Sequence, residues 1–130
     1  MSGATNPRPL SPHLQIWRWH VTMATSIFHR ATGVALYGAA ALLVAWLIAL
    51  ASGPEVYAPV EAFLQGTLGQ AALFATLVAL AYHLANGVRH LMWDTGANLN
   101  PKAAAVSAWL AILFAIAAPT ALFAYLRMGG

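Results

Sequence analysis

Residues 79–94 of the chain read ALAYHLANGVRHLMWD, an apolar run that includes imidazole groups. Read as a helix at about 100° per residue, this stretch has four residues on one face, namely His83, Gly87, His90 and Asp94. An ionisable group at membrane depth is costly, and such a residue usually has a partner and a function. The glycine one turn from His83 leaves room for a flat, bulky group near the backbone. The stretch therefore predicts a membrane helix with a functional histidine.

The composition is that of a membrane protein. Of the 130 residues, 61% are hydrophobic and 7% are charged, whereas about 25% are charged in an average soluble domain. Uncharged runs extend over Ala31–Pro54, Ala62–Val88 and Ala103–Leu126, and each is longer than the ~20 residues that a helix needs to cross the hydrocarbon. The sequence predicts an all-α integral membrane protein with three transmembrane helices, forming a single membrane-anchor domain over 1–130.

The helix boundaries follow from breakers and capping residues. We expect a polar N-terminal segment and three membrane spans, at 1–22 and at about 23–51, 68–93 and 102–125. Between the first two spans, the loop Ser52–Gly66 opens on a Ser-Gly-Pro breaker and has room for a single interfacial turn around Pro59–Gln65. Asn100-Pro101 supplies an N-cap residue and a proline at the first helical position, so it begins the third helix. Pro119 is expected to kink that helix.

Basic residues predict the orientation, because Lys and Arg are in excess in cytoplasmic loops. One expected membrane surface has Arg8, Arg18, Arg30, Arg89 and Lys102, and the opposite surface has Arg127. We therefore expect the N-terminus to face the cytoplasm or its organelle equivalent. The start of the first span and the end of the second then share a surface, where one polar site is expected from Ser26, His29, Arg30, Arg89, His90 and Asp94.

The composition also excludes several kinds of site. No cysteine is present, which excludes disulfides, protein-ligated iron–sulfur clusters and the covalent attachment of a c-type haem. The six Lys and Arg residues are too dispersed for a phosphate-binding stripe, so we expect no nucleic-acid partner. Any haem is therefore expected to be bound non-covalently.

His83 is the candidate for a mid-membrane site. It precedes Trp93 by about ten residues, which corresponds to a depth of ~15 Å below the surface. Two interpretations are equally compatible with it, a b-type haem ligand and a histidine that hydrogen-bonds a neighbouring helix. His29 is expected nearer the surface, and His90 lies two turns along the same helix. If an iron here has two histidine ligands, we expect the second from another chain.

Ser26 and Arg30 form a second candidate site at the start of the first span. They are spaced i and i+4, with Gly33 at i+7, so a hydroxyl and a guanidinium share a face beside a close-approach position. The pair can donate hydrogen bonds to a quinone carbonyl or a haem propionate. Taken alone, Arg30 also fits an interfacial arginine that reaches lipid phosphates. Arg89 with Asp94 likewise fits a solvated helix end with a salt bridge.

Three motifs together resemble a known family: RPLSPHL at 8–14, SIFHRATG at 26–33 and HLANGVRHLMWD at 83–94. In this order and spacing, they are similar to the cytochrome b556 subunit of succinate dehydrogenase. The resemblance covers nearly the whole chain and leaves the first few residues, the Ser52–Gly66 loop and the last span without motif support. Trp17 stands where tyrosine is frequent in the family.

This resemblance implies half of a heterodimeric haem-binding helix bundle. The chain would pair with a second small membrane-anchor subunit and dock an iron–sulfur subunit and a flavoprotein subunit. Succinate would be oxidised on the flavoprotein, with no catalytic residue for that step in this chain, and electrons would pass to ubiquinone at the anchor. Carried over by motif, His83 is the axial ligand of one shared haem b. Ser26 and Arg30 line the quinone site, and the haem propionates lie near His29, Arg30 and His90.

Other functions stay open on the sequence alone. A haem-free structural anchor, the anchor of a quinol:fumarate reductase and a small transporter that uses the buried histidine for protons are each compatible with three spans. The second haem ligand, the quinone type and the oligomeric state have no signature in the residues.

Overall fold

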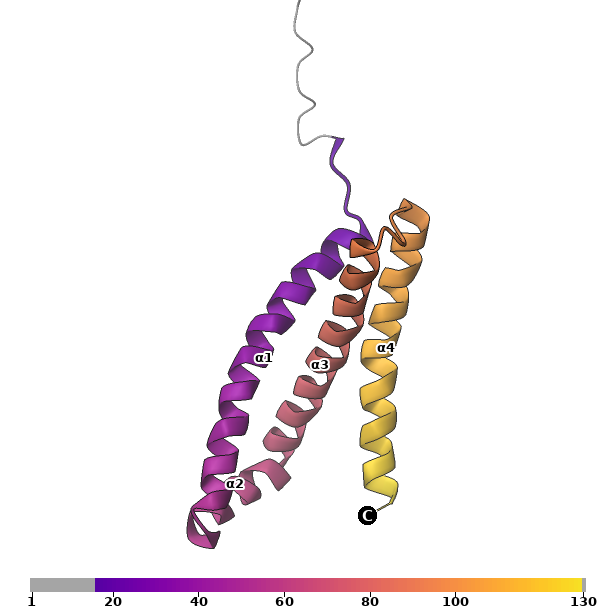
Figure 1. Ribbon diagram of the computed structural model, residues 1–130. Coiled ribbons are helices and arrows are strands. Elements are labelled where there is room, and N and C mark those ends of the chain that lie inside the picture. Colours follow the sequence, from indigo (N-terminus) through magenta and orange to yellow (C-terminus); the bar gives the residue numbers. More distant parts are fainter. Residues whose placement is uncertain (1–15, 130) are drawn as a thin grey trace, which may run out of the picture.

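The computed structural model describes residues 16–129, and over this range it consists of helices joined by short connections: α1 (Val21–Ala51), α2 (Pro54–Gln65), α3 (Thr67–Asp94) and α4 (Pro101–Met128). The long helices α1, α3 and α4 lie side by side, and the short helix α2 connects α1 to α3 (Figure 1). Helix α3 contacts each of the other three helices. The prediction of an all-α protein with three membrane helices is confirmed.

The surfaces of the three long helices are apolar. Their mean hydropathy reaches 2.3 in α1, 1.6 in α3 and 2.1 in α4. Large apolar side chains point outward, including Val34 at 75% exposure and Leu42 at 73%. Such a surface is unfavourable in water but suits a lipid environment.

Small side chains form the contacts between the helices. Within residues 16–129, the buried apolar side chains are Ala49, Tyr82, Ala108, Ala111 and Ala115. All of them except the tyrosine are alanine, and in membranes small residues let helix backbones approach closely where no hydrophobic effect drives association. The interior therefore has room for few large groups. Besides Tyr82, the polar side chains of Thr25, Asn86 and Arg89 are buried within residues 16–129.

The observed helices extend slightly beyond the predicted spans. Helix α1 begins at Val21 rather than near residue 23, and α4 ends at Met128 rather than near residue 125. The capping prediction for α4 is confirmed, because the side chain of Asn100 accepts a hydrogen bond of 2.9 Å from the backbone N–H of Lys102. Helix α4 continues past Pro119 to its end, and the kink there stays a prediction. The motif at 8–14 and most of the N-terminal segment lie outside the described residues.

The prediction of a loop over Ser52–Gly66 is wrong, because most of it is the 12-residue helix α2. Gly53 has a φ of 101°, a left-handed conformation that suits glycine and redirects the chain after α1. Pro54 then occupies the first turn of α2, where its missing N–H costs nothing. Glu55 follows in the same turn and interacts favourably with the helix dipole. The proline that marks a break therefore also begins a helix.

Gly69 allows a tight corner between α2 and α3. It is buried, and a Cβ atom added there would lie 2.1 Å from the carbonyl oxygen of Phe63 and 2.6 Å from the Cα atom of Leu64. The side-chain amide of Gln70 closes the corner by donating a hydrogen bond of 2.8 Å to the carbonyl of Leu64. The corner brings the chain back towards the start of α1.

Candidate functional site

The imidazole of His83 lies against helix α1. Its Nδ1 atom is 3.2 Å from the backbone oxygen of His29 and 3.3 Å from the hydroxyl of Thr32. Gly33 provides the space, because a Cβ atom there would lie 3.1 Å from Cε1 of His83. Both contacts are at Nδ1, and within residues 16–129 the Nε2 atom of His83 has no hydrogen-bond partner. The ring is thus held from one side, and its other nitrogen is free to bind a group.

A column of aromatic rings continues from His83 towards the end of α3. The ring of His29 stacks on that of His83 with centroids 4.0 Å apart and an interplanar angle of 15°. His90 follows at 5.2 Å from His29, and Trp93 at 4.8 Å from His90. We call His83, His29, His90 and Trp93 the imidazole column.

The rings of His29 and His83 are in contact, and His29 lies on the side of His83 that faces the end of α3, beside His90. The expectation that His29 lies nearer the surface than His83 stays a prediction. The stacked His29 also occupies the space next to Gly87, whose added Cβ would lie 4.0 Å from Cε1 of His29. The Nδ1 atom of His29 is buried and has no hydrogen-bond partner within residues 16–129.

The residues of this column do not form a complete metal site by themselves. Within residues 16–129, no group of three or more His, Cys, Asp or Glu side chains is arranged to hold a metal ion. Imidazoles bind metals through lone pairs in the ring plane, so two rings stacked face to face cannot ligate one iron from opposite sides. An iron at His83 would need its second axial ligand from outside the described residues.

Ser26 and Arg30 lie together, as predicted from their spacing. They line an open cavity of ≈ 350 Å³ with Thr22, Met23 and Ile27, and all of these residues belong to α1. No residue of α3 or α4 contributes to its wall in the part of the chain that the structure describes. The cavity is therefore an open hollow on the surface of α1 alone.

Arg89 does not join this site. Its guanidinium is only 4% exposed and faces α4, where it donates hydrogen bonds to Ser107 (3.1 Å) and to the carbonyl of Ala104 (3.2 Å). It also stacks on Trp93 at 4.8 Å. The interpretation of Arg89 as part of a solvated helix end is wrong, and the polar site expected at this surface is divided. Asp94 remains exposed at the end of α3.

A second polar group, which we call the arginine cluster, comprises Arg89, Asn86, Thr25 and Tyr82. Arg89 donates to the side-chain oxygen of Asn86 and, at 3.4 Å, to the hydroxyl of Thr25. The Tyr82 hydroxyl donates to the backbone oxygen of Thr25 at 2.7 Å. Sequence reasoning missed this cluster, although Tyr82, Asn86 and Arg89 have the same i, i+4, i+7 spacing that identified the face of His83. That spacing is the signal that could have revealed it.

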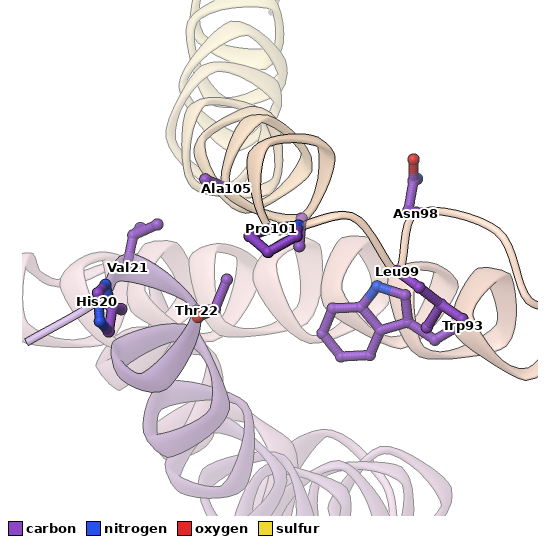
Figure 2. A pocket seen from close by; sticks show the side chains of 9 residues that line it. His20, Val21, Thr22, Trp93, Asn98, Leu99, Pro101 and Ala105 are labelled. Carbon is purple, nitrogen blue, oxygen red and sulfur yellow. The ribbon is translucent and has the colours of Figure 1, made fainter.

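A larger cavity lies between the start of α1 and the connection from α3 to α4. It has a volume of ≈ 430 Å³, and its lining includes His20, Trp93 and Leu99. Figure 2 shows the side chains around this cavity, which come from the start of α1, from the end of α3 with the connection that follows it, and from the start of α4. None of the predicted quinone or haem residues lines this cavity. It adjoins both candidate sites, because Trp93 also belongs to the imidazole column and Thr22 also lines the cavity of Ser26 and Arg30.

The sequence matches the family described as Succinate dehydrogenase/Fumarate reductase transmembrane subunit over residues 4–122. The chain belongs to this family. The resemblance inferred from its three motifs is thereby confirmed. As a member, it is a multi-pass membrane protein and the membrane part of an oxidoreductase complex.

Similar proteins come from bacteria and from mitochondria. This transmembrane subunit is 39% identical to the succinate dehydrogenase cytochrome b556 subunit of Rickettsia felis, over 85% of the chain and 86% of that protein. It is 41% identical to the cytochrome b556 subunit of Paracoccus denitrificans, over 71% of each. The mitochondrial cytochrome b560 subunit of Mus musculus is 40% identical over 75% of the chain and 59% of that longer protein.

Proposed function

We propose that this chain is the cytochrome b anchor of a succinate:quinone oxidoreductase, in which its single domain, 1–130, binds one haem b together with a second small anchor subunit. The proposal rests chiefly on His83, an imidazole inside a membrane helix with one nitrogen held and the other free. The names of the similar proteins, which are cytochrome subunits of succinate dehydrogenase, support it.

The residues of the imidazole column fit one side of a haem. The unprotonated nitrogen of a neutral imidazole is a common ligand of haem iron, and Nε2 of His83 is available for this role. The buried Nδ1 of His29 lacks a partner within residues 16–129 and can donate to a carboxylate, so it suits a propionate. His90 and Arg30 are proposed to lie in the same propionate region. When bound, the haem would accept and donate one electron at a time.

The proposal of a companion anchor subunit rests on what the described residues do not supply. The described residues offer one imidazole for axial ligation, and the cavity of Ser26 and Arg30 has a wall from α1 alone. We propose that the second subunit provides the other axial ligand and the opposite wall. The iron–sulfur and flavoprotein subunits dock on the cytoplasmic surface, at which the basic residues gather.

The cavity of Ser26 and Arg30 is the proposed contribution to the ubiquinone site. The Ser26 hydroxyl donates to a quinone oxygen, and the Arg30 guanidinium stabilises the negative charge that this oxygen gains on reduction. The isoprenoid tail stays in the lipid. We place the chain in a bacterial inner membrane or its mitochondrial equivalent, with a cytoplasmic N-terminus.

One observation favours a second candidate function, a haem-free structural anchor. His83 hydrogen-bonds the neighbouring helix α1, as a purely structural histidine would. The two candidates differ in whether Nε2 carries iron. The anchor of a quinol:fumarate reductase shares the same site, and the family description covers both enzymes.

The visible spectrum of the purified complex decides between the haem-binding anchor and the haem-free anchor. The reduced-minus-oxidised spectrum is expected to contain a b-type haem, and His83→Leu is expected to remove it or strongly change it. His20→Leu is the control, because that exposed histidine lies before α1 and outside the imidazole column. This chain expressed without its companion is expected to lack low-spin haem. A spectrum and haem content unchanged by His83→Leu in the assembled complex would exclude the assignment.

A further inference from the structure

The contacts of His83 determine which of its two nitrogens carries the proton. Its Nδ1 lies 3.2 Å from the backbone oxygen of His29, and a carbonyl oxygen only accepts hydrogen bonds. A neutral imidazole that makes this contact therefore has its proton on Nδ1 and its lone pair on Nε2. Helix α1 thus selects the tautomer in which Nε2 can bind a metal.

Thr32 supplies the second acceptor for the same N–H. Its hydroxyl lies 2.8 Å from the carbonyl of Phe28 and 3.0 Å from that of His29, so its single hydrogen is used within α1. The oxygen of Thr32 is then an acceptor for Nδ1–H of His83 at 3.3 Å. Among residues 16–129, this is the one side chain that hydrogen-bonds the His83 ring.

This arrangement differs from that of Thr76 and Thr120, two other threonines in the long helices. Thr76 and Thr120 each donate to a carbonyl four residues earlier in their own helix, at 2.8 Å and 2.7 Å. That local bond is common for threonine in helices. Thr32 combines it with a contact to a ring 51 residues away in sequence, beside the space that Gly33 provides.

We propose that Thr32 is the positioning residue of the haem ligand: it accepts from Nδ1–H of His83 and so orients the imidazole and adjusts its strength as an iron ligand. This inference rests on the proposed ligation by His83. When one ring nitrogen of an imidazole binds a metal, a hydrogen-bond acceptor at the N–H of the other nitrogen raises the basicity of the imidazole and fixes its orientation. A stronger donor stabilises the oxidised iron, so removal of the acceptor shifts the reduction potential of the haem to a more positive value.

The test compares Thr32→Val with Thr32→Ser in the purified four-subunit complex. Thr32→Val keeps the branched shape and removes the hydroxyl, and it is expected to raise the midpoint potential of the haem and to shift its low-temperature electron paramagnetic resonance signal. Thr32→Ser is expected to restore both to wild-type values. Thr76→Val, on α3 like His83, is the matched control and is expected to change neither. Thr32→Ala provides a second hydroxyl-free variant, with a residue that helices favour.

The outcomes separate this inference from the proposed function. A complex in which His83→Leu abolishes the haem, while Thr32→Val and Thr32→Ala leave its potential and resonance signal unchanged, would overturn the role of Thr32 and leave the ligation intact. A wild-type complex without haem would overturn the ligation itself. An equal shift in Thr76→Val would show a general effect of hydroxyl loss and would also count against Thr32.

Discussion

At the scale of single residues, α3 carries polar groups on two faces, and their surroundings differ. His83 is held on one edge and has a free nitrogen on the other, which is the arrangement of a ligand. Arg89 donates hydrogen bonds to Ser107, Ala104, Thr25 and Asn86. A buried guanidinium so fully occupied has little capacity to bind a substrate, so we interpret Arg89 as a link between helices α1, α3 and α4.

The first prediction at this scale concerns Ser26. A hydrogen bond to an oxygen that gains negative charge contributes about 1.5 kcal/mol, so Ser26→Ala is expected to lower kcat/KM for quinone by about tenfold. Succinate oxidation with a soluble artificial acceptor is expected to stay unchanged, because that assay bypasses the anchor. Steady-state kinetics on the assembled, haem-containing complex measures both.

Ser52→Ala is the control for this prediction, because Ser52 is exposed at the opposite end of α1 and donates to Ile48. Arg30→Leu is a less specific test, since Arg30 is also proposed to lie near the haem propionates. If the quinone kinetics of Ser26→Ala equal those of the wild type, Ser26 is not a quinone ligand, and the donors must lie on the partner chains.

At the scale of elements, the connection from α1 to α3 has more structure than its sequence suggests. Helix α2 is bounded by Gly53 at one end and Gly66 at the other, and each glycine redirects the chain. The corner after α2 brings Gly69 so close to the backbone of Phe63 that no side chain fits. The start of α3, and thus the level of His83 on α1, depends on this corner.

Gly69→Ala is therefore expected to destabilise the subunit. The added methyl group would overlap a backbone carbonyl, and overpacking of this kind costs about 1–3 kcal/mol or more. We expect a lower thermal denaturation midpoint in detergent and a lower yield of assembled complex. Gly38→Ala in α1 is the control, because a Cβ atom there meets nothing within 4 Å. Equal midpoints for the two variants would show that the corner can move at no cost.

At the scale of the whole molecule, the chain is an incomplete bundle. Three long helices expose most of their apolar surface, and one candidate site is open along the face of α1. This shape suits a subunit surrounded partly by lipid and partly by a second anchor. The orientation of the bundle sets which membrane surface faces the soluble subunits.

The orientation gives the prediction at this scale. Alkaline phosphatase, which is active only outside the cytoplasm, is expected to be active when fused after Glu55 or after Gly130. Fused after Asn98, between α3 and α4, it is expected to be inactive. The excess of Lys and Arg on the N-terminal side is the physical reason. Activity only in the Asn98 fusion would reverse the orientation and move the docking surface to the other side.

The sequence by itself determined the fold class, the ends of the three long helices within a few residues, and the family. These depend on local properties, namely uninterrupted apolar length, capping residues such as Asn100, and motifs contiguous in the chain. It also identified His83 and the pairing of Ser26 with Arg30, because residues four apart on one helix must be neighbours.

Only the tertiary structure decided which helix faces meet. The stacking of His29 on His83, the burial of Arg89 against Ser107 and the contact of Thr32 with His83 all join different helices. Periodicity indicates which residues share a face, but it does not determine the rotation or the height of one helix against another. Those depend on where small residues let the backbones approach, and this is why the contact between the rings of His29 and His83 could not be read from the sequence.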